Sequence, residues 1–307
     1  MINGVIVVKK EKGMTSFGVV ARLRRIFDQK KIGHTGTLDP DAEGVLPVCF
    51  GRATRLVETL SKGTKTYEAV MLLGQTTDTQ DTTGQVLSEA QWPESREEIE
   101  AAIRSFEGKQ QQLPPMYSAL KVNGQKLVDL ARRGIEVERK PREVEFSELE
   151  VLWIDPPRAA FRVTCTHGAY IRTLCHDIGQ KLGCGACMES LLRTRVGEFD
   201  LQEARTLQEL EEQKKAEDAA SGAAPALYSF VLPVDSFYAE LQAVTVRAED
   251  LVSVLNGNPI PAQPEDPIRK SEEVRAYTED GTFIGIYKKE RKLYRLVKYY
   301  YEDHQSS

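Results

Sequence analysis

The sequence predicts an α+β fold built on a mixed sheet, followed by a small β-rich C-terminal domain. Strand and helix patterns alternate irregularly over the first part of the chain, and few gaps allow consecutive right-handed β-α-β crossovers. No Gly-x-Gly-x-x-Gly or P-loop pattern follows the first strand, which argues against a doubly wound nucleotide-binding fold. Beyond Val231 only short strand patterns separated by turns remain.

The first domain is expected to begin with a buried, β-branched strand over residues 4–8. A helix should run from Ser16 to Phe27, with its N-cap at Thr15 or Ser16 and its arginines opposite the apolar face. The Thr/Asp-rich segment 75–84 and the extended segment 112–117 are expected to be connections. The remaining patterns predict strands over 45–50, 66–73, 144–154, 160–166 and 191–199, and helices over 51–60, 95–106, 125–133, 170–182 and from 206 onward.

A run of small residues from Ala219 to Pro225 is typical of a linker between domains. We therefore expect a first domain of residues 1–230 and a β-rich second domain of residues 231–303. The strand patterns of the second domain lie at 243–246, 274–277, 283–288 and 293–299.

The composition is that of a globular protein rather than one with a uniformly basic surface. The 307 residues carry a net charge of -5, and 41% of them are hydrophobic. Five cysteines, no signal-peptide pattern and no apolar run of membrane-spanning length predict a reduced cytoplasmic protein without membrane association. Basic residues are nevertheless grouped away from the acidic segments, which is compatible with a polyanionic partner: Arg22, Arg24, Arg25, Lys30 and Lys31, and Lys121, Lys126, Arg132, Arg133, Arg139, Lys140 and Arg142.

The stretch from Gly33 to Pro47 is the best candidate for a functional loop. Its glycines and prolines exclude a regular helix or a central strand, and it lies between a predicted helix and a predicted strand. Pro40 restricts the backbone of Asp39 to extended conformations, so this carboxylate is partly fixed in place. On the local pattern alone, Asp39 fits both the cap of a turn and a catalytic acid.

A metal site has little support in the sequence. Cys184 and Cys187 have C-x-x-C spacing, and further possible ligands lie upstream, at Cys165, His167, Cys175 and His176. However, Cys175 and His176 are adjacent in a helical pattern and so lie on different faces. No second C-x-x-C or H-x₃₋₅-H motif is present, and segment 75–84 lacks the spacing of an EF-hand. We therefore expect neither a metal nor a cofactor.

Seven segments, in order along the chain, resemble the bacterial TruB-type tRNA pseudouridine synthases, which act on the uridine of the TΨC loop. They are Asn3-Gly4 with Lys10 and 13–16, then 33–40, 65–67, 73–79, 115–121, 168–173 and 191–194. The resemblance spans essentially the whole chain. It implies a largely antiparallel mixed sheet with flanking helices and a central active-site cleft, and a C-terminal domain similar to the PUA RNA-binding domain.

The resemblance implies an isomerase that converts uridine at tRNA position 55 to pseudouridine. The base would be flipped out, the glycosidic bond cleaved with the help of an aspartate, and a C–C bond formed in its place. Nothing is oxidised and no group enters from outside, so no cofactor is required. The implied partner is tRNA, bound by its T stem-loop and, through the C-terminal domain, by its acceptor end; no obligate protein partner is implied.

Three residues match the catalytic positions of the family. Asp39 corresponds to the carboxylate that acts on either the ribose carbon or the base, and Arg172 corresponds to its cationic partner. Tyr67 matches the aromatic residue that stacks on the uracil and helps to move the C5 proton. From its pattern alone, Tyr67 would be a core residue of a strand.

Four further residues match substrate-binding positions. Tyr170 and Leu191 would form walls of the uracil pocket, His34 would hold the substrate loop once the base has left its stack, and Lys10 would lie close to the site. Residues 121–145 fall where the family has a mobile segment that closes over the RNA.

Basic residues of the second domain would contact the acceptor end, namely Arg269, Lys270, Lys288, Lys289, Arg291 and Lys292. Two positions depart from the family pattern: Glu11 replaces the usual Pro, and Cys187 replaces a common His. Two other classes of function compete with the isomerase. One is a non-catalytic tRNA-binding protein that uses the same cleft. The other is a magnesium-dependent phosphotransferase with Asp39, Asp41 and Glu43 as its acids.

Overall fold

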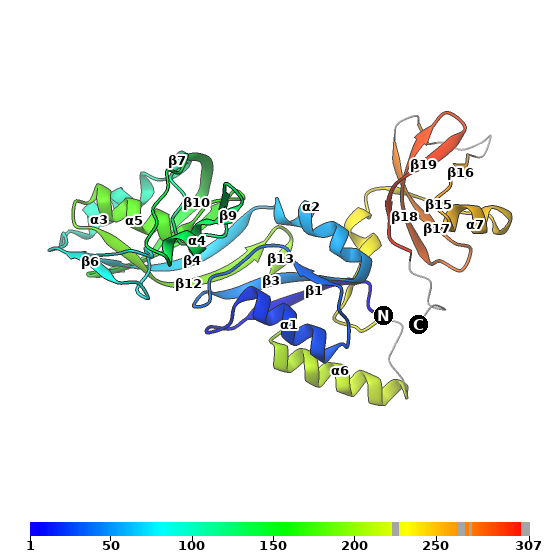
Figure 1. The fold of residues 1–307 in the computed structure, drawn as a ribbon, viewed down its shortest axis with the longest axis horizontal. Coiled ribbons are helices and arrows are strands. Elements are labelled where there is room, and N and C mark those ends of the chain that lie inside the picture. The colour runs from blue at the N-terminus through cyan, green and yellow to red at the C-terminus, as the bar shows by residue number, and fades with distance from the viewer. Residues whose placement is uncertain (223–226, 263–267, 270–271, 302–307) are drawn as a thin grey trace.

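The computed structural model describes residues 1–307 except 223–226, 263–267, 270–271 and 302–307 (Figure 1). The described residues confirm the α+β class. The larger sheet has the strand order β14-β1-β3-β12-β4-β11-β10-β7, with β2 paired to β3 and β13 paired to β12. Its pairings are antiparallel except for that of β12 with β3.

The strands of this sheet are β1 (Gly4–Lys10), β2 (Ile32–His34), β3 (Glu43–Phe50), β4 (Lys65–Leu73), β7 (Gly108–Gln112), β10 (Arg142–Asp155), β11 (Arg158–Cys165), β12 (Ala186–Val196), β13 (Phe199–Asp200) and β14 (Leu232–Pro233). Most follow the predicted patterns, but β2, β7 and β14 were not predicted. The expectation that the stretch 33–47 excludes a central strand was wrong at its end, because Pro47 lies within β3, between β1 and β12.

Helices cover both halves of the large sheet. Helices α1 (Ser16–Ile26) and α6 (Leu207–Ser221) pack on β1 and β3, whereas α3 (Arg96–Arg104) and α5 (Ile171–Lys181) pack on the strands around β4 (Figure 1). Helix α1 begins where the Thr15 hydroxyl accepts a hydrogen bond from the Gly18 amide, which confirms the predicted N-cap.

Several connections contain short elements that the pattern did not predict. The segment 75–84 includes β5 (Gln75–Thr77), which pairs with β6 (Val86–Glu89). The helix predicted over 125–133 is only α4 (Leu127–Ala131), preceded by the small hairpin β8 (Lys121–Val122) and β9 (Gln125–Lys126). The helix predicted over 51–60 is a 3₁₀ turn, η1 (Gly51–Leu56), followed by α2 (Val57–Ser61).

A second sheet of five strands has the order β15-β17-β18-β19-β16. Its strands are β15 (Gln242–Thr245), β16 (Ile260–Pro261), β17 (Glu273–Tyr277), β18 (Phe283–Glu290) and β19 (Leu293–Tyr299), and it carries an unpredicted helix, α7 (Ala248–Leu255). The chain returns to the large sheet before entering this second sheet, because β14 pairs with the start of β1 and is followed by η2 (Val234–Tyr238).

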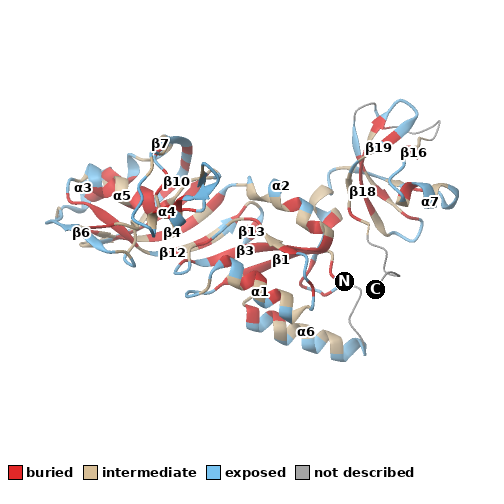
Figure 2. Cartoon of the chain, viewed as in Figure 1, coloured by how far each residue is buried: buried red, intermediate tan, exposed pale blue. Residues whose placement is uncertain are grey.

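Both sheets have a buried interior (Figure 2). Strand β1 is buried along almost its whole length because its two faces meet different clusters. Ile6 and Val8 face α1 and α6, whereas Val5 and Val7 belong to a cluster that also holds residues of the second sheet. Among the described residues, no helix is both long and apolar enough to cross a lipid bilayer.

Candidate functional site

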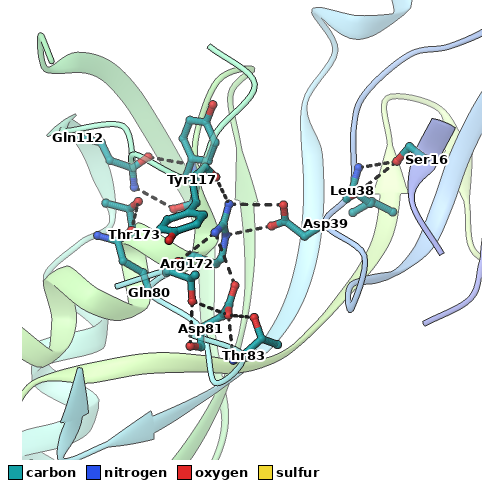
Figure 3. A network of polar contacts seen from close by, with 12 residues as sticks. Ser16, Leu38, Asp39, Gln80, Asp81, Thr83, Gln112, Tyr117, Arg172 and Thr173 are labelled. Carbon is teal, nitrogen blue, oxygen red and sulfur yellow. Dashed lines mark hydrogen bonds and ion pairs between the residues drawn. The ribbon is translucent and has the colours of Figure 1, made fainter. Parts of the chain in front are cut away.

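The Asp39 loop joins β2 to β3, and its backbone is fixed on both sides of the carboxylate. Leu38 is buried and its backbone is bound twice by Ser16, whose hydroxyl accepts from the Leu38 amide at 2.9 Å and donates to the Leu38 carbonyl at 3.2 Å (Figure 3). The Ala42 amide donates to the Asp39 carbonyl at 3.1 Å. These contacts limit the positions that the Asp39 side chain can reach, which favours a preorganised site.

Lys10 lies beneath this loop rather than on its surface. The side chain is 1% exposed, and its ammonium donates to the carbonyls of Glu11 and Pro40, both at 3.0 Å, and of Ala42 at 2.5 Å. Burial lowers the pKa of Lys10 to about 8, although the carboxylate of Asp39 opposes the shift. Lys10 therefore stabilises the loop from below by binding its backbone carbonyls.

Arg172 is the cationic partner of Asp39. It is the second residue of α5, and its side chain is only 6% exposed. Its Nε lies 2.9 Å from Asp39 Oδ2, and a terminal nitrogen donates to Oδ1 at 3.4 Å, so the guanidinium approaches the carboxylate as a fork (Figure 3). The expected ion pair between these two residues is therefore present.

The other contacts of Arg172 hold its guanidinium in place. Its terminal nitrogens donate to the carbonyls of Thr79 and Tyr117, each at 2.9 Å, and lie 3.5 Å from Asp81 Oδ2 (Figure 3). A buried guanidinium with this many acceptors is held in one orientation.

Asp39 combines burial with access to solvent. Burial raises the pKa of its carboxyl, Arg172 opposes that rise, and the nearby carboxylate of Asp81 adds to it. The side chain is still 40% exposed, in contrast to its buried partner. A carboxylate held in this way can meet a substrate from the solvent side while its charge is balanced from the protein side.

An apolar wall lies beside the carboxylate. Tyr67 from β4 and Leu191 from β12 are each 7% exposed and belong to one buried cluster with Leu38. Burial raises the pKa of the Tyr67 hydroxyl, with the guanidinium of Arg193 opposing the shift. The backbone of Tyr170 is held by the Gln112 amide group, which accepts from its N–H at 2.8 Å and donates to its carbonyl at 3.0 Å.

His34 is the residue of β2 opposite Val48 and is half-buried. Burial lowers the pKa of its imidazole, and the charge of Arg193 lowers it further. Its buried Nδ1 has no hydrogen-bond partner among the described residues. The structure thus brings together Asp39, Arg172, Tyr67, Tyr170 and Leu191, with His34 just before the loop in β2 and Lys10 beneath it.

Three residues of the site were not singled out by the sequence. Asp81 lies just beyond the segment that resembles the family, in a loop without periodicity. Tyr117 and Arg193 lie within such segments and could have been found there. Arg193 is 1% exposed and donates to the carbonyls of Val45 at 2.7 Å and Gly36 at 3.1 Å, so it ties β12 to the loop.

The described part of the chain holds no group of three or more His, Cys, Asp or Glu side chains placed to bind a metal ion. All five cysteines are free and buried. Cys187 is a residue of β12, and its neighbours on the sheet are residues of β4.

Comparison with known proteins places the chain among RNA-modifying proteins. Residues 24–171 match the family model described as "TruB family pseudouridylate synthase (N terminal domain)", and residues 172–238 match "tRNA pseudouridylate synthase B C-terminal domain". A tRNA pseudouridine synthase B from Lachnoclostridium phytofermentans is 43% identical, over 97% of this chain and 99% of the relative. One from Clostridium acetobutylicum is 39% identical over 97% and 99% of the two chains.

Solved structures of related proteins have a similar fold over nearly the whole chain. The structure described as a Cbf5-Nop10-Gar1 complex contains a chain with a TM-score of 0.67 and 28% identity, over 97% of this chain and 85% of the other. An H/ACA RNP bound to a substrate RNA contains one with a TM-score of 0.66 and 26% identity, with the same coverage.

Proposed function

The chain belongs to the TruB family of pseudouridylate synthases, and on that premise we propose that it isomerises the TΨC-loop uridine, position 55 of tRNA, to pseudouridine. As a member of this family it is an isomerase that acts on uridine in tRNA. The choice of position and the roles of individual residues are our proposal.

The observation that carries the proposal is the forked ion pair between Asp39 and Arg172. Arg172 is buried and multiply bonded, whereas Asp39 is partly exposed, so the pair presents one oriented carboxylate toward solvent. Such a carboxylate can attack, or stabilise charge on, an electron-poor carbon without a cofactor.

In the reaction the bond between uracil N1 and ribose C1′ breaks and a bond between uracil C5 and C1′ forms. The proton on C5 leaves and N1 gains one, so the product is an isomer and the electrons balance. Asp39 acts as the nucleophile, on either the ribose carbon or the base, and Arg172 keeps it ionised and oriented. Tyr67 stacks on the uracil and helps to move the C5 proton, while Tyr170 and Leu191 line the uracil pocket.

The target base must leave the folded RNA loop before it can reach Asp39, at a cost of about a few kcal/mol. His34 would hold the substrate loop in that state, and the segment 121–145 would close over the RNA. Lys10 supports the site from beneath the loop.

We also propose that the second domain, residues 231–303, is a PUA-like unit that contacts the acceptor end of the tRNA. Three of its basic residues extend from the end of β18 to the start of β19, at Lys288, Arg291 and Lys292. A fourth, Lys289, is only 9% exposed and its ammonium lies over the ring of Tyr294, so it is not part of this surface. Arg269 is a fifth, and Lys270 lies outside the described residues. The buried free cysteines fit the proposed cytoplasmic location.

The test is tritium release from tRNA labelled at uracil C5. The wild-type protein should release tritium without added metal, and Asp39→Asn should reduce the rate by at least about a thousandfold, because the amide cannot act as a nucleophile. Asp41→Asn, which removes the same charge two residues further along the loop, serves as the control and should keep most of the activity.

Binding of the same tRNA distinguishes an isomerase from a non-catalytic tRNA-binding protein. Asp39→Asn should bind within about threefold of wild type, since the carboxylate acts in the reaction rather than in RNA affinity. If the wild-type protein binds tRNA but releases no tritium, the protein is a non-catalytic tRNA-binding protein and the proposal is wrong.

A further inference from the structure

Three neighbouring strands bring basic residues to one end of the large sheet. Strand β10 begins at Arg142, β11 ends at Cys165 and β4 begins at Lys65. Because β10 and β4 both pair antiparallel to β11, with Phe146 opposite Cys165 and Cys165 opposite Lys65, these three strand ends lie side by side. The same end of the sheet leads directly into Tyr170 and α5.

Arg142 occurs on the face of β10 that carries the site. Val144 and Phe146 are buried in the same cluster as Tyr67, and Arg142 precedes Val144 by two residues, so the alternation of the strand gives it the same face. Its partner across the strand pair is Gln112, whose side chain holds the backbone of Tyr170. Gln112 and Tyr170 therefore lie between Arg142 and the proposed uracil pocket.

His167 lies in the turn that follows β11. The ladder between β10 and β11 continues into this turn, because the Thr166 amide donates to the Glu145 carbonyl at 3.1 Å and the Glu145 amide donates to the Thr166 hydroxyl at 3.0 Å. Burial and the neighbouring charges of Lys65, Arg142 and Lys62 lower the pKa of the His167 imidazole. Three cations, Lys62, Lys65 and Arg142, therefore lie around the His167 imidazole, and we call this group the cationic strand end.

Within the described residues, only one cation of the cationic strand end, Lys62, is paired with a carboxylate. The neighbouring acid Glu143 alternates to the other face of β10, where it lies 3.3 Å from Lys109. Glu58 pairs with Lys62 at the exposed surface, at 3.0 Å. Lys65 is buried and donates only to the carbonyls of Ser61 and Gly63, at 2.8 and 2.7 Å. In the described part of the chain neither Arg142 nor Lys65 has an ion pair with a carboxylate.

We propose that the cationic strand end binds an RNA phosphodiester next to the target uridine, with Arg142 and His167 as its direct contacts and Lys65 as a fixed charge behind them. Arg142 supplies a planar set of donors that matches a phosphate, and the turn of His167 lies beside it. Tyr170 connects this end of the sheet to α5, which carries Arg172 of the Asp39–Arg172 pair. It therefore holds the backbone beside a base that has entered the pocket, which fixes the register of the RNA. This inference rests on the proposed function.

The test measures binding of a T stem-loop RNA. Arg142→Ala should raise Kd about tenfold and lower the slope of log Kd against log salt by about 0.9. Arg158→Ala is the matched control. It removes the same charge from the opposite end of the same strand pair, where Arg158 is paired with Glu189 at 2.8 Å, and it should leave Kd unchanged.

A substrate with one neutral methylphosphonate linkage locates the contact. Wild type should lose about tenfold in affinity when the modified linkage is on one side of the target uridine, and Arg142→Ala should lose almost nothing further with the same RNA. His167→Ala should behave in the same way. The inference is overturned if Arg142→Ala binds like wild type, or if its loss adds fully to that of either modified linkage. Because these readouts are binding constants, they stand even if the protein forms no pseudouridine, which would overturn only the proposed function.

Discussion

Asp39 and Arg172 are separated by 133 residues in the chain, yet they form a two-point ion pair in the site. Two forces act on the Asp39 carboxyl in opposite directions. Burial and the charge of Asp81 raise its pKa, and the guanidinium of Arg172 lowers it. A carboxylate that is less stabilised in this way is a better nucleophile than a fully solvated one, provided that it remains ionised at working pH.

The protonation of Asp39 should make kcat/KM depend on pH. If ionised Asp39 is required, kcat/KM should fall about tenfold per pH unit below the pKa of Asp39, and this acid limb should lie above the ordinary value of 3.8 because the pKa is raised. Asp81→Asn removes a like charge that raises the pKa of Asp39, so the limb should move to lower pH. The measurement is the pH profile of single-turnover kcat/KM for both proteins. A limb that stays in place or moves to higher pH in Asp81→Asn would contradict this assignment.

At the scale of elements, the site depends on the pairing of β3 with β12. This is the parallel pairing of the large sheet, with Leu192 opposite Glu43 and Arg193 opposite Gly44. The backbones approach so closely that a Cβ added at Gly44 would lie 2.1 Å from the carbonyl oxygen of Arg193. Gly44 has a φ of +110°, a region that favours glycine. The glycine therefore sets the distance between the Asp39 loop and the strand that carries Leu191.

The matching prediction compares two glycines. Gly44→Ala should destabilise the protein by at least about 3 kcal/mol, because backbone strain and a backbone clash add together. Gly108→Ala has a similar φ of +94° but no atom within 4 Å of the added Cβ, so it should cost only about 1–2 kcal/mol. Urea unfolding measures both. Equal losses in the two variants would mean that the close approach to Arg193 relaxes and is not a constraint.

Sequence patterns predicted the elements well where periodicity was strong, as in β4 and α1. They did not predict which distant segments meet. Without the family resemblance, nothing in the helix pattern around Arg172 indicated that its side chain would point at Asp39. Asp81 was missed because it lies in a loop without periodicity, and its position depends on the β5–β6 hairpin. Lys10 was expected near the substrate, but its burial depends on the pairing of β1 with β3, which no local pattern reveals.

At the scale of the whole molecule, the two sheets share an apolar seam. Val5 and Val7 of β1 belong to the same buried cluster as Ile286 of β18 and Tyr300. A polar contact also crosses the seam, because the Asn3 side chain donates to the Tyr300 carbonyl at 2.9 Å. Contacts of this kind join the second domain to the large sheet.

Two substitutions can show whether this seam stabilises the large sheet. Ile284 and Ile286 are the same residue type in the same strand, and both are buried, but Ile284 packs inside the second domain and Ile286 packs in the seam. Each change to alanine should cost about 2–5 kcal/mol at its own site. Ile286→Ala should therefore increase hydrogen exchange of the β1 amides, measured by mass spectrometry under native conditions, whereas Ile284→Ala should increase exchange mainly in β17 and β19. If both variants raise exchange in β1 equally, the two domains unfold as one unit. The seam would then stabilise the large sheet no more than the interior of the second domain does.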